Sequence, residues 1–321
     1  MKDLDVIGIG ALNVDQFYRV ERILEDGESV TRGSATYPGG SAANTVHGLS
    51  RLGVKTGFVG AVGDDADGRL LTRAFQRAGV DISHVFVKPR ARTGSVLCLS
   101  DEFGHRSLYV TPGANGLLSA EDIDQAYLKK AQILHLATFV DDRQFELSVA
   151  LVQKLPRGVR LSFSPGALYA SRGMKSMVPI LRHTAFLFIN RQELERLTGQ
   201  RLESGVRTFM KEGCRTVVVT LGAGAKIGRT DATCYIRAGD REYIIEALPA
   251  ETGRPTDTTG AGDAFAAGYL FGVLEGKPED VCGRLGHLEA LSAISKMGAR
   301  QGLPTLAHLS NRYQRTYGQS L

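Results

Sequence analysis

Residues 257–265 read Asp-Thr-Thr-Gly-Ala-Gly-Asp-Ala-Phe and lead into an almost uninterrupted apolar segment. Gly260, Ala261 and Gly262 are small, so the backbone there can approach a ligand closely. If a helix begins at this point, its first amide groups have no partner within the helix, and the helix dipole adds partial positive charge. The sequence therefore predicts an anion-binding turn of the kind that holds a phosphate group.

Asp263 lies within the same turn. A carboxylate held beside a bound phosphate can take the proton from an alcohol that attacks phosphorus. The structural alternative is a helix opened by Thr and Gly, in which Asp263 only favours the dipole. The complete string favours the catalytic interpretation over this alternative.

The composition is that of an ordinary globular protein with a large core. Of the 321 residues, 43% are hydrophobic and 23% are charged. The net charge is +5 with Lys and Arg dispersed, so no nucleic-acid partner is expected. The N-terminus has no signal-peptide pattern, and no run of about 18 apolar residues predicts a membrane span. We expect a cytoplasmic protein with no membrane partner.

Short apolar runs alternate with amphipathic stretches along most of the chain. Strands are predicted over residues 6–9, 56–59, 133–136, 160–163, 186–189 and 216–220. Helices are predicted over residues 42–52, 68–78, 141–154, 192–198 and 205–211. This alternation is typical of a mostly parallel central sheet with helices on both faces, a three-layer α/β/α architecture.

Two polar, turn-rich segments interrupt the alternation, at residues 13–37 and 92–111. Each is typical of an antiparallel hairpin, and together they could form a small sheet beside the main body. No internal repeat or linker divides the chain, so we predict a single domain, residues 1–321, with the hairpins inserted as a β-sheet lid. Free sheet edges are commonly covered by a second copy, so we also expect a homodimer through the lid.

A second glycine-rich turn precedes the helix predicted over residues 42–52. Residues 38–44 read Pro-Gly-Gly-Ser-Ala-Ala-Asn, and paired glycines before a helix permit close approach to a ligand. Asn44 could offer its amide to a ligand hydroxyl. The alternative is an ordinary turn and capped helix. Residues 8–13 imitate a dinucleotide fingerprint, but the third glycine is missing and no helical pattern follows, so we reject an NAD site.

The string at residues 257–265 resembles the signature of the ribokinase-like (PfkB) family of sugar and nucleoside kinases, and the other motifs occur in that family's order. The resemblance implies a ribokinase-like fold and transfer of a phosphoryl group from ATP to a hydroxymethyl group, with ADP as donor left open. It implies Asp263 as the general base. The amides of Gly260, Ala261 and Gly262 would form the anion hole.

For the acceptor, the resemblance implies one set of binding residues: Asn13, Asp15, Gly39, Gly40 and Asn44. Asn13 and Asp15 come at the end of the first predicted strand, where the family binds sugar hydroxyls. Ser41 stands where ribose-specific members typically carry Lys and nucleoside-directed members more often carry Ser. Three functions therefore stay open: a sugar kinase, a nucleoside kinase, and a catalytically silent sugar-binding protein.

For the donor, the resemblance implies an Asn-x-x-Glu motif in which Asn190 and Glu193 organise phosphate, water and Mg²⁺, Glu193 acting through water. An ordinary capping box is the structural alternative for that pair. Thr220, Gly222 and Gly224 are assigned to the nucleotide-binding turn; the family's second glycine usually comes three residues after the first, where this chain has Ala225, so Gly224 is one residue early.

Two further assignments concern the C-terminal part of the chain. His287, at the start of a helix-like stretch, matches the residue beside the adenine ring, with a partly buried surface histidine as the alternative. The backbone carbonyls of Asp257 and Thr259 match a region that holds a monovalent cation such as K⁺ in several family members.

Overall fold

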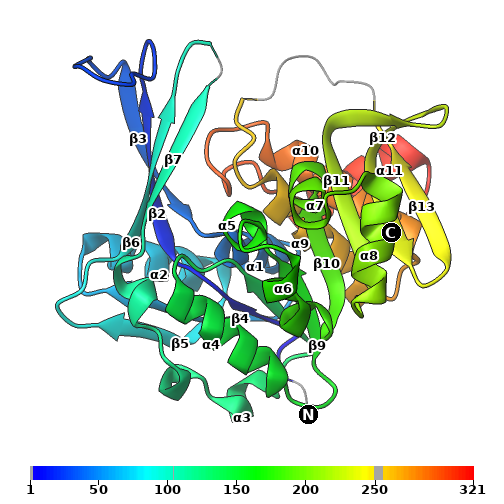
Figure 1. Cartoon of the computed structure of the whole chain (residues 1–321), viewed down its shortest axis with the longest axis horizontal. Helices are drawn as coiled ribbons and strands as arrows, with labels where there is room; N and C mark the ends of the chain where they lie inside the picture. Colours follow the sequence, from blue (N-terminus) through cyan, green and yellow to red (C-terminus); the bar gives the residue numbers. More distant parts are fainter. Residues whose placement is uncertain (1–2, 104, 249–255) are drawn as a thin grey trace.

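The computed structural model describes residues 3–103, 105–248 and 256–321, and its centre is a nine-stranded sheet (Figure 1). The strand order is β13-β12-β11-β10-β9-β8-β1-β4-β5. The strands from β11 to β5 pair in parallel, and β12 and β13 continue the sheet antiparallel. Their bounds are β1 Val6–Ile9, β4 Thr56–Gly63, β5 Asp81–Lys88, β8 Ile133–Ala137, β9 Arg160–Ser164, β10 Thr184–Asn190, β11 Thr216–Ile227, β12 Thr230–Ala238 and β13 Arg241–Glu246.

Buried side chains alternate between the two faces of this sheet, because successive residues of a strand point in opposite directions. On β11, Val217 and Val219 join the apolar cluster that contains Phe209, whereas Val218 joins the cluster that contains Leu285. The first face is covered by α4 Asp142–Gln153, α5 Gly166–Ala170, α6 Met174–Leu181, α7 Arg191–Thr198 and α8 Leu202–Lys211. The second is covered by α1 Ser41–Arg51, α9 Ala261–Leu274, α10 Glu279–Ala293 and α11 Leu306–Tyr317. The predicted three-layer architecture is confirmed.

A second, four-stranded sheet projects beside these layers, at the upper left of Figure 1. Its order is β3-β2-β6-β7, with bounds β2 Asn13–Arg19, β3 Gly33–Gly39, β6 Gly94–Ser100 and β7 Arg106–Thr111. The β2–β3 and β6–β7 pairs are antiparallel, as expected for two hairpins, and β2 and β6 join them in parallel. Since β1 ends at Ile9, Asp15 lies inside the second sheet rather than at the end of the first strand.

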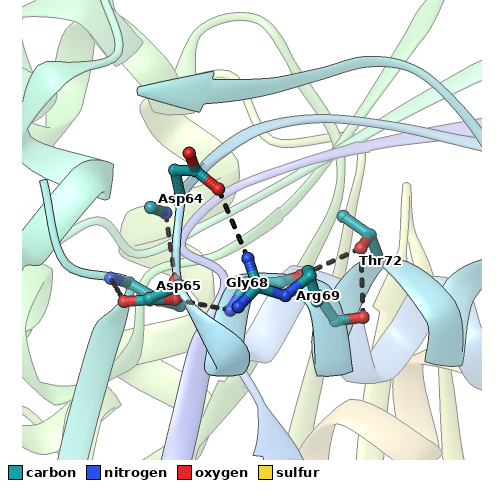
Figure 2. A network of polar contacts seen from close by, with 7 residues as sticks. Asp64, Asp65, Gly68, Arg69 and Thr72 are labelled. Atoms are coloured by element: carbon teal, nitrogen blue, oxygen red, sulfur yellow. Dashed lines mark hydrogen bonds and ion pairs between the residues drawn. The ribbon is translucent and has the colours of Figure 1, made fainter. Parts of the chain in front are cut away.

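Helix α2 (Ala66–Ala78) packs over α1 and begins at a closed polar network (Figure 2). The N-cap residue Asp65 accepts a hydrogen bond from the amide of Gly68 at 2.8 Å. The same carboxylate accepts bonds from the amide and the hydroxyl of Thr93, at 2.8 and 2.6 Å. Because Thr93 directly precedes β6, this cap also fixes where the chain enters the second sheet.

The C-terminal helix prediction needs one correction. His287 does not begin a helix: α10 starts at Glu279, so His287 lies in its middle, and the helix ends at Ala293. The earlier start has a physical reason, since Pro278 precedes two acidic residues, Glu279 and Asp280, that favour the positive end of a helix dipole. None of the helices in the described ranges has the length and apolar character needed to cross a membrane.

Candidate active site

The first turn of α9 is open, as the sequence predicts. Its N-cap residue Gly260 has a φ of 76° and provides no side-chain cap. A Cβ atom at Gly260 would lie 2.5 Å from the Cβ atom of Ala299, so glycine is required there. A Cβ atom at Gly262 would meet nothing within 4 Å. The turn therefore presents its backbone to free space, at the end of the helix that attracts anions.

Asp263 is held in this turn by helix α1. Its carboxylate accepts hydrogen bonds from Ser41 Oγ at 2.6 Å and from Asn44 Nδ2 at 2.9 Å. Thr45 Oγ1 donates to the backbone carbonyl of Asp263 at 3.2 Å. Burial raises the pKa of Asp263 to about 6, against the opposing effect of the two side-chain hydrogen bonds. A carboxylate with a pKa near neutrality is suited to general base catalysis.

Asp15 and the paired glycines form a second part of the site. Asp15 is buried, and a Cβ atom at Gly39 would lie 2.2 Å from its Oδ1 atom. Gly40 has a φ of 95°, and a Cβ atom there would lie 2.1 Å from the carbonyl oxygen of Ala11. Burial raises the pKa of Asp15 to about 7; the charge of Asp263 also acts upward on it. The two carboxylates therefore interact within one site.

Asn13 and Asn44 are both engaged with other protein groups. Asn13 Oδ1 accepts a hydrogen bond from Asn115 Nδ2 at 2.9 Å, and Asn115 also binds the amide of Leu12 at 2.8 Å. Asn13 thus fixes the chain where it passes from β1 to β2. Asn44, for which the sequence suggests a ligand hydroxyl, directs its amide at Asp263.

Asn190 and Glu193 lie at the carboxyl end of β10 and form the capping box that was the structural alternative. Asn190 Oδ1 accepts from the Glu193 amide at 2.8 Å, and Glu193 Oε2 accepts from the Asn190 amide at 3.1 Å. Burial raises the pKa of Glu193, and the charge of Asp263 adds to that rise. Glu193 is therefore within electrostatic reach of the open turn of α9.

The next strand carries a glycine-rich bulge. Asn190 pairs with Thr220 on β11, and the pairing of β11 with β12 is interrupted between Thr220 and Ala225. Inside the bulge Gly222 and Gly224 have φ values of 63° and 111°, which favour glycine, and both residues are exposed. The bulge leaves backbone accessible beside the Asn190 motif.

His287 and Asp257 have their side chains bound within the protein. His287 Nδ1 lies 3.1 Å from the hydroxyl of Thr233 on β12, and burial lowers its pKa to about 4. Asp257 binds the amide of Thr259 and the amide of Gly298, each at 3.0 Å. Burial alone would raise the pKa of Asp257, but these hydrogen bonds hold it below its usual value. The side chain of Asp257 is thus engaged by backbone amides, and the cation assignment for Asp257 and Thr259 concerns their backbone carbonyls.

The sequence matches the family model described as pfkB family carbohydrate kinase over residues 2–306. The chain belongs to the pfkB family. This confirms the resemblance carried by residues 257–265 and makes the chain a sugar or nucleoside kinase.

Individual pfkB-family proteins show how far the similarity extends. The chain is 37% identical over 257 residues to an uncharacterized sugar kinase of Archaeoglobus fulgidus, covering 80% of this chain and 98% of the relative. It is 26% identical over 308 residues to a nucleoside kinase of Methanocaldococcus jannaschii, covering 96% of each. The structure of an Arabidopsis thaliana ribokinase complexed with ribose and ATP superimposes with a TM-score of 0.80 at 25% identity, covering 95% and 97% of the two chains.

Glu193 is the carboxylate of the Asn190 motif in this pfkB-family chain. Within the described ranges, no three His, Cys, Asp or Glu side chains are grouped to hold a metal ion. Mg²⁺ does not require such a group, because it keeps several waters and binds through one or two carboxylates and the substrate phosphates. Glu193 interacts electrostatically with Asp263 and is a carboxylate suited to binding Mg²⁺.

Sequence reasoning missed Arg106 and Arg300 in this pfkB-family site. Arg106, on β7, binds the Thr258 hydroxyl at 2.8 Å and the Asp257 carboxylate at 3.0 Å, which ties the second sheet to the loop before α9. No local pattern marks Arg106, because its partners are distant in sequence. Arg300 is different: a charged residue inside the glycine-rich string Gly-Ala-Arg-Gln-Gly at 298–302 is itself a signal of a buried polar role.

Proposed function

We propose that this pfkB-family chain transfers the γ-phosphoryl group of ATP to the hydroxymethyl group of a ribose-like or fructose-like sugar. One observation carries the proposal. Asp263 stands in the uncapped first turn of α9, and its carboxylate is oriented by α1 and interacts with buried Asp15. In this proposal Asp263 is the base, the turn binds the transferring phosphoryl group, and Asp15 binds the acceptor.

The reaction follows from these positions. Asp15, Gly39 and Gly40 bind and orient the acceptor hydroxyls, and Asn44 orients the base. Asp263 accepts the proton of the hydroxymethyl group as its oxygen forms a bond to the γ-phosphorus. The bond from that phosphorus to the bridging oxygen breaks, and ADP leaves. The amides of the Gly260–Gly262 turn stabilise the charge spread over the transferring oxygens.

The donor lies on the same edge of the central sheet in this proposal. The bulge with Thr220, Gly222 and Gly224 would bind the nucleotide, and neutral His287 would lie near the adenine ring. Asn190 and Glu193 would hold Mg²⁺ through water, and the ion would neutralise phosphate charge. ADP in place of ATP as donor is a variant of the same proposal. The closing of the four-stranded sheet as a lid would exclude water from the reaction.

Two accessory features belong to the proposal. The backbone carbonyls of Asp257 and Thr259 would bind K⁺, so replacing K⁺ by a bulky organic cation should lower activity. The four-stranded sheet has free edges at β3 and β7, and Leu108 and Tyr109 on β7 are 60% and 58% exposed. We propose that a second copy covers this sheet. Light scattering that finds only a 34.6 kDa species would contradict the dimer.

A nucleoside kinase is the second candidate, because Ser41 donates to the catalytic carboxylate where ribose-specific relatives typically carry Lys. A silent sugar-binding protein is the third candidate, and the open turn with its oriented acid argues against it. The test is ADP release from ATP with a panel of sugars and nucleosides. Release with sugars supports the proposal and release with nucleosides alone supports the second candidate. No release with any acceptor supports the third.

A further inference from the structure

Arg300 is a buried cation directly behind the catalytic residues. Its side chain lies in the loop after α10, and the residue is 7% exposed. Arg300 Nε donates to Asn44 Oδ1 at 2.8 Å, and Nη2 donates to the carbonyl oxygen of Gly39 at 2.7 Å. The guanidinium also lies over the ring of Phe75, 5.3 Å from its centroid. These contacts from three elements fix the guanidinium in one place.

The bond to Asn44 has a consequence for the base. Arg has only donors, so the Asn44 atom that it contacts must be the amide oxygen. The amide nitrogen is then the atom that faces Asp263, to which it donates at 2.9 Å. A flipped amide would place donor against donor at Arg300 and oxygen against carboxylate at Asp263. Arg300 therefore selects the Asn44 orientation that supports the base.

The bond to Gly39 reaches the acceptor side of the site. Gly39 ends β3 and lies against Asp15, with no room for a side chain between them. By holding the Gly39 carbonyl, Arg300 fixes the backbone that Asp15 packs against. One guanidinium thus connects the base and the acceptor carboxylate.

The charge of Arg300 acts on both carboxylates without a direct ion pair. Among the described residues no ion pair links Arg300 to Asp15 or Asp263, and its Nη1 has no hydrogen-bond partner. The positive charge lowers the pKa of each carboxyl group against the upward effect of burial. Burial lowers the pKa of Arg300 itself to about 10, so it stays protonated at neutral pH. Among the described residues, two anions also interact with Asp263: Asp15 on β2 and Glu193 on α7.

We propose that Arg300 is a positioning residue for acceptor deprotonation: it orients the Asn44 amide toward Asp263 and supplies the positive charge that keeps this base ionised. The proposal rests on the proposed function, because it assumes that Asp263 accepts the acceptor proton. It assigns no contact between Arg300 and the substrate.

The test compares Arg300→Met, which removes the charge and both hydrogen bonds, with Arg300→Lys, which keeps the charge. Arg207→Met is the matched control, since Arg207 is an exposed residue on α8. For Arg300→Met we expect kcat to fall about 10- to 100-fold at pH 7. The pKa of Asp263 should rise when the cation is lost, so the acid limb of the kcat–pH profile should move up by about one pH unit.

Arg300→Lys should keep the acid limb of the wild type but lose kcat several-fold, because one ammonium cannot reproduce the planar fork that holds Asn44 and Gly39. Circular dichroism shows whether each variant folds. If Arg300→Met is unfolded, Arg300→Lys decides, and wild-type kcat in that variant would overturn the proposal. A folded Arg300→Met with an unmoved acid limb would also overturn it, because a purely structural role lowers activity without changing the titration of the base.

If the proposed kinase function itself is wrong, measurements that do not involve the Arg300 variants will show it. In that case the wild-type protein releases no ADP with any acceptor, or Asp263→Ala retains normal turnover, before any Arg300 variant is compared.

Discussion

Helices α2 and α9 begin with the same three residue types in a different order, Ala-Asp-Gly at 66–68 and Ala-Gly-Asp at 261–263. In α2 the carboxylate of the N-cap residue Asp65 closes over the amide of Gly68 (Figure 2). In α9 the N-cap residue is Gly260, which has no side chain to do so. The N-cap residue makes the difference. Asp65 caps the first turn of α2, whereas the first turn of α9 has no side-chain cap, which is the arrangement that the proposed phosphate site requires.

The acids of the two turns differ in the same way. Asp67 lies in the first turn of α2, where it favours the helix dipole. Asp263 lies in the first turn of α9 but is held by Ser41 and Asn44, which are more than 200 residues earlier in the chain. Long-range hydrogen bonds, rather than the local sequence, fix the orientation of the Asp263 carboxylate, the base in our proposal.

The largest expected effect is that of Asp263→Ala. We expect kcat to fall by about two to four decades, the usual contribution of a general base. Nucleotide binding, measured by calorimetry, should survive because the backbone of the turn is unchanged. Asp67→Ala is the matched control and should retain kcat. Near-normal turnover of Asp263→Ala would contradict the proposal that Asp263, unlike Asp67, acts as the general base.

Gly262 in α9 and Gly68 in α2 should respond differently to substitution by alanine: the first should lose activity and the second should lose stability. Gly262→Ala meets no atom within 4 Å, so thermal stability should be retained while the methyl intrudes on the proposed phosphoryl position. We expect its kcat to fall about 100-fold. In Gly68→Ala the Cβ atom would lie 2.3 Å from the carbonyl oxygen of Gly63. This variant should lose about 1–3 kcal/mol of unfolding free energy with kcat unchanged. Equal losses of stability in both would contradict the comparison.

The smallest effect is expected for Asp65→Ala, which opens the first turn of α2. Loss of an N-cap costs about 0.5–2 kcal/mol of stability, and the bonds to Thr93 are lost as well. Denaturant unfolding should show this loss, while turnover of the folded protein stays the same. A large fall in kcat would mean that α2 belongs to the active site.

Much of the fold was predictable because its signals are local. Apolar runs such as residues 216–220 are long enough to mark buried strands, and the polar segments between them mark the hairpins. The start of α10 was not predictable from His287, because the signal that matters is Pro278 followed by acids. The family signature identified the open turn of α9 because Gly260 has a positive φ and no space for a side chain.

The rest of the site depends on contacts between distant segments. Asn44 was recognised as a site residue, but its partner could not be known, since Asp263 and Arg300 approach it only when α1 and α9 pack together. Asn13 was assigned to the acceptor, and its Oδ1 atom accepts a hydrogen bond from Asn115, whose position depends on a separate turn. Sequence patterns indicate which residue types are present, and packing decides which of them are free to bind a ligand.

A crystal structure of the protein with a non-hydrolysable ATP analogue and an acceptor tests the central claim most directly. The account predicts the terminal phosphate within about 3 Å of amide nitrogens in the first turn of α9, with the Asp263 carboxylate beside the acceptor hydroxyl. A phosphate bound elsewhere, with that turn covered only by solvent, would contradict it.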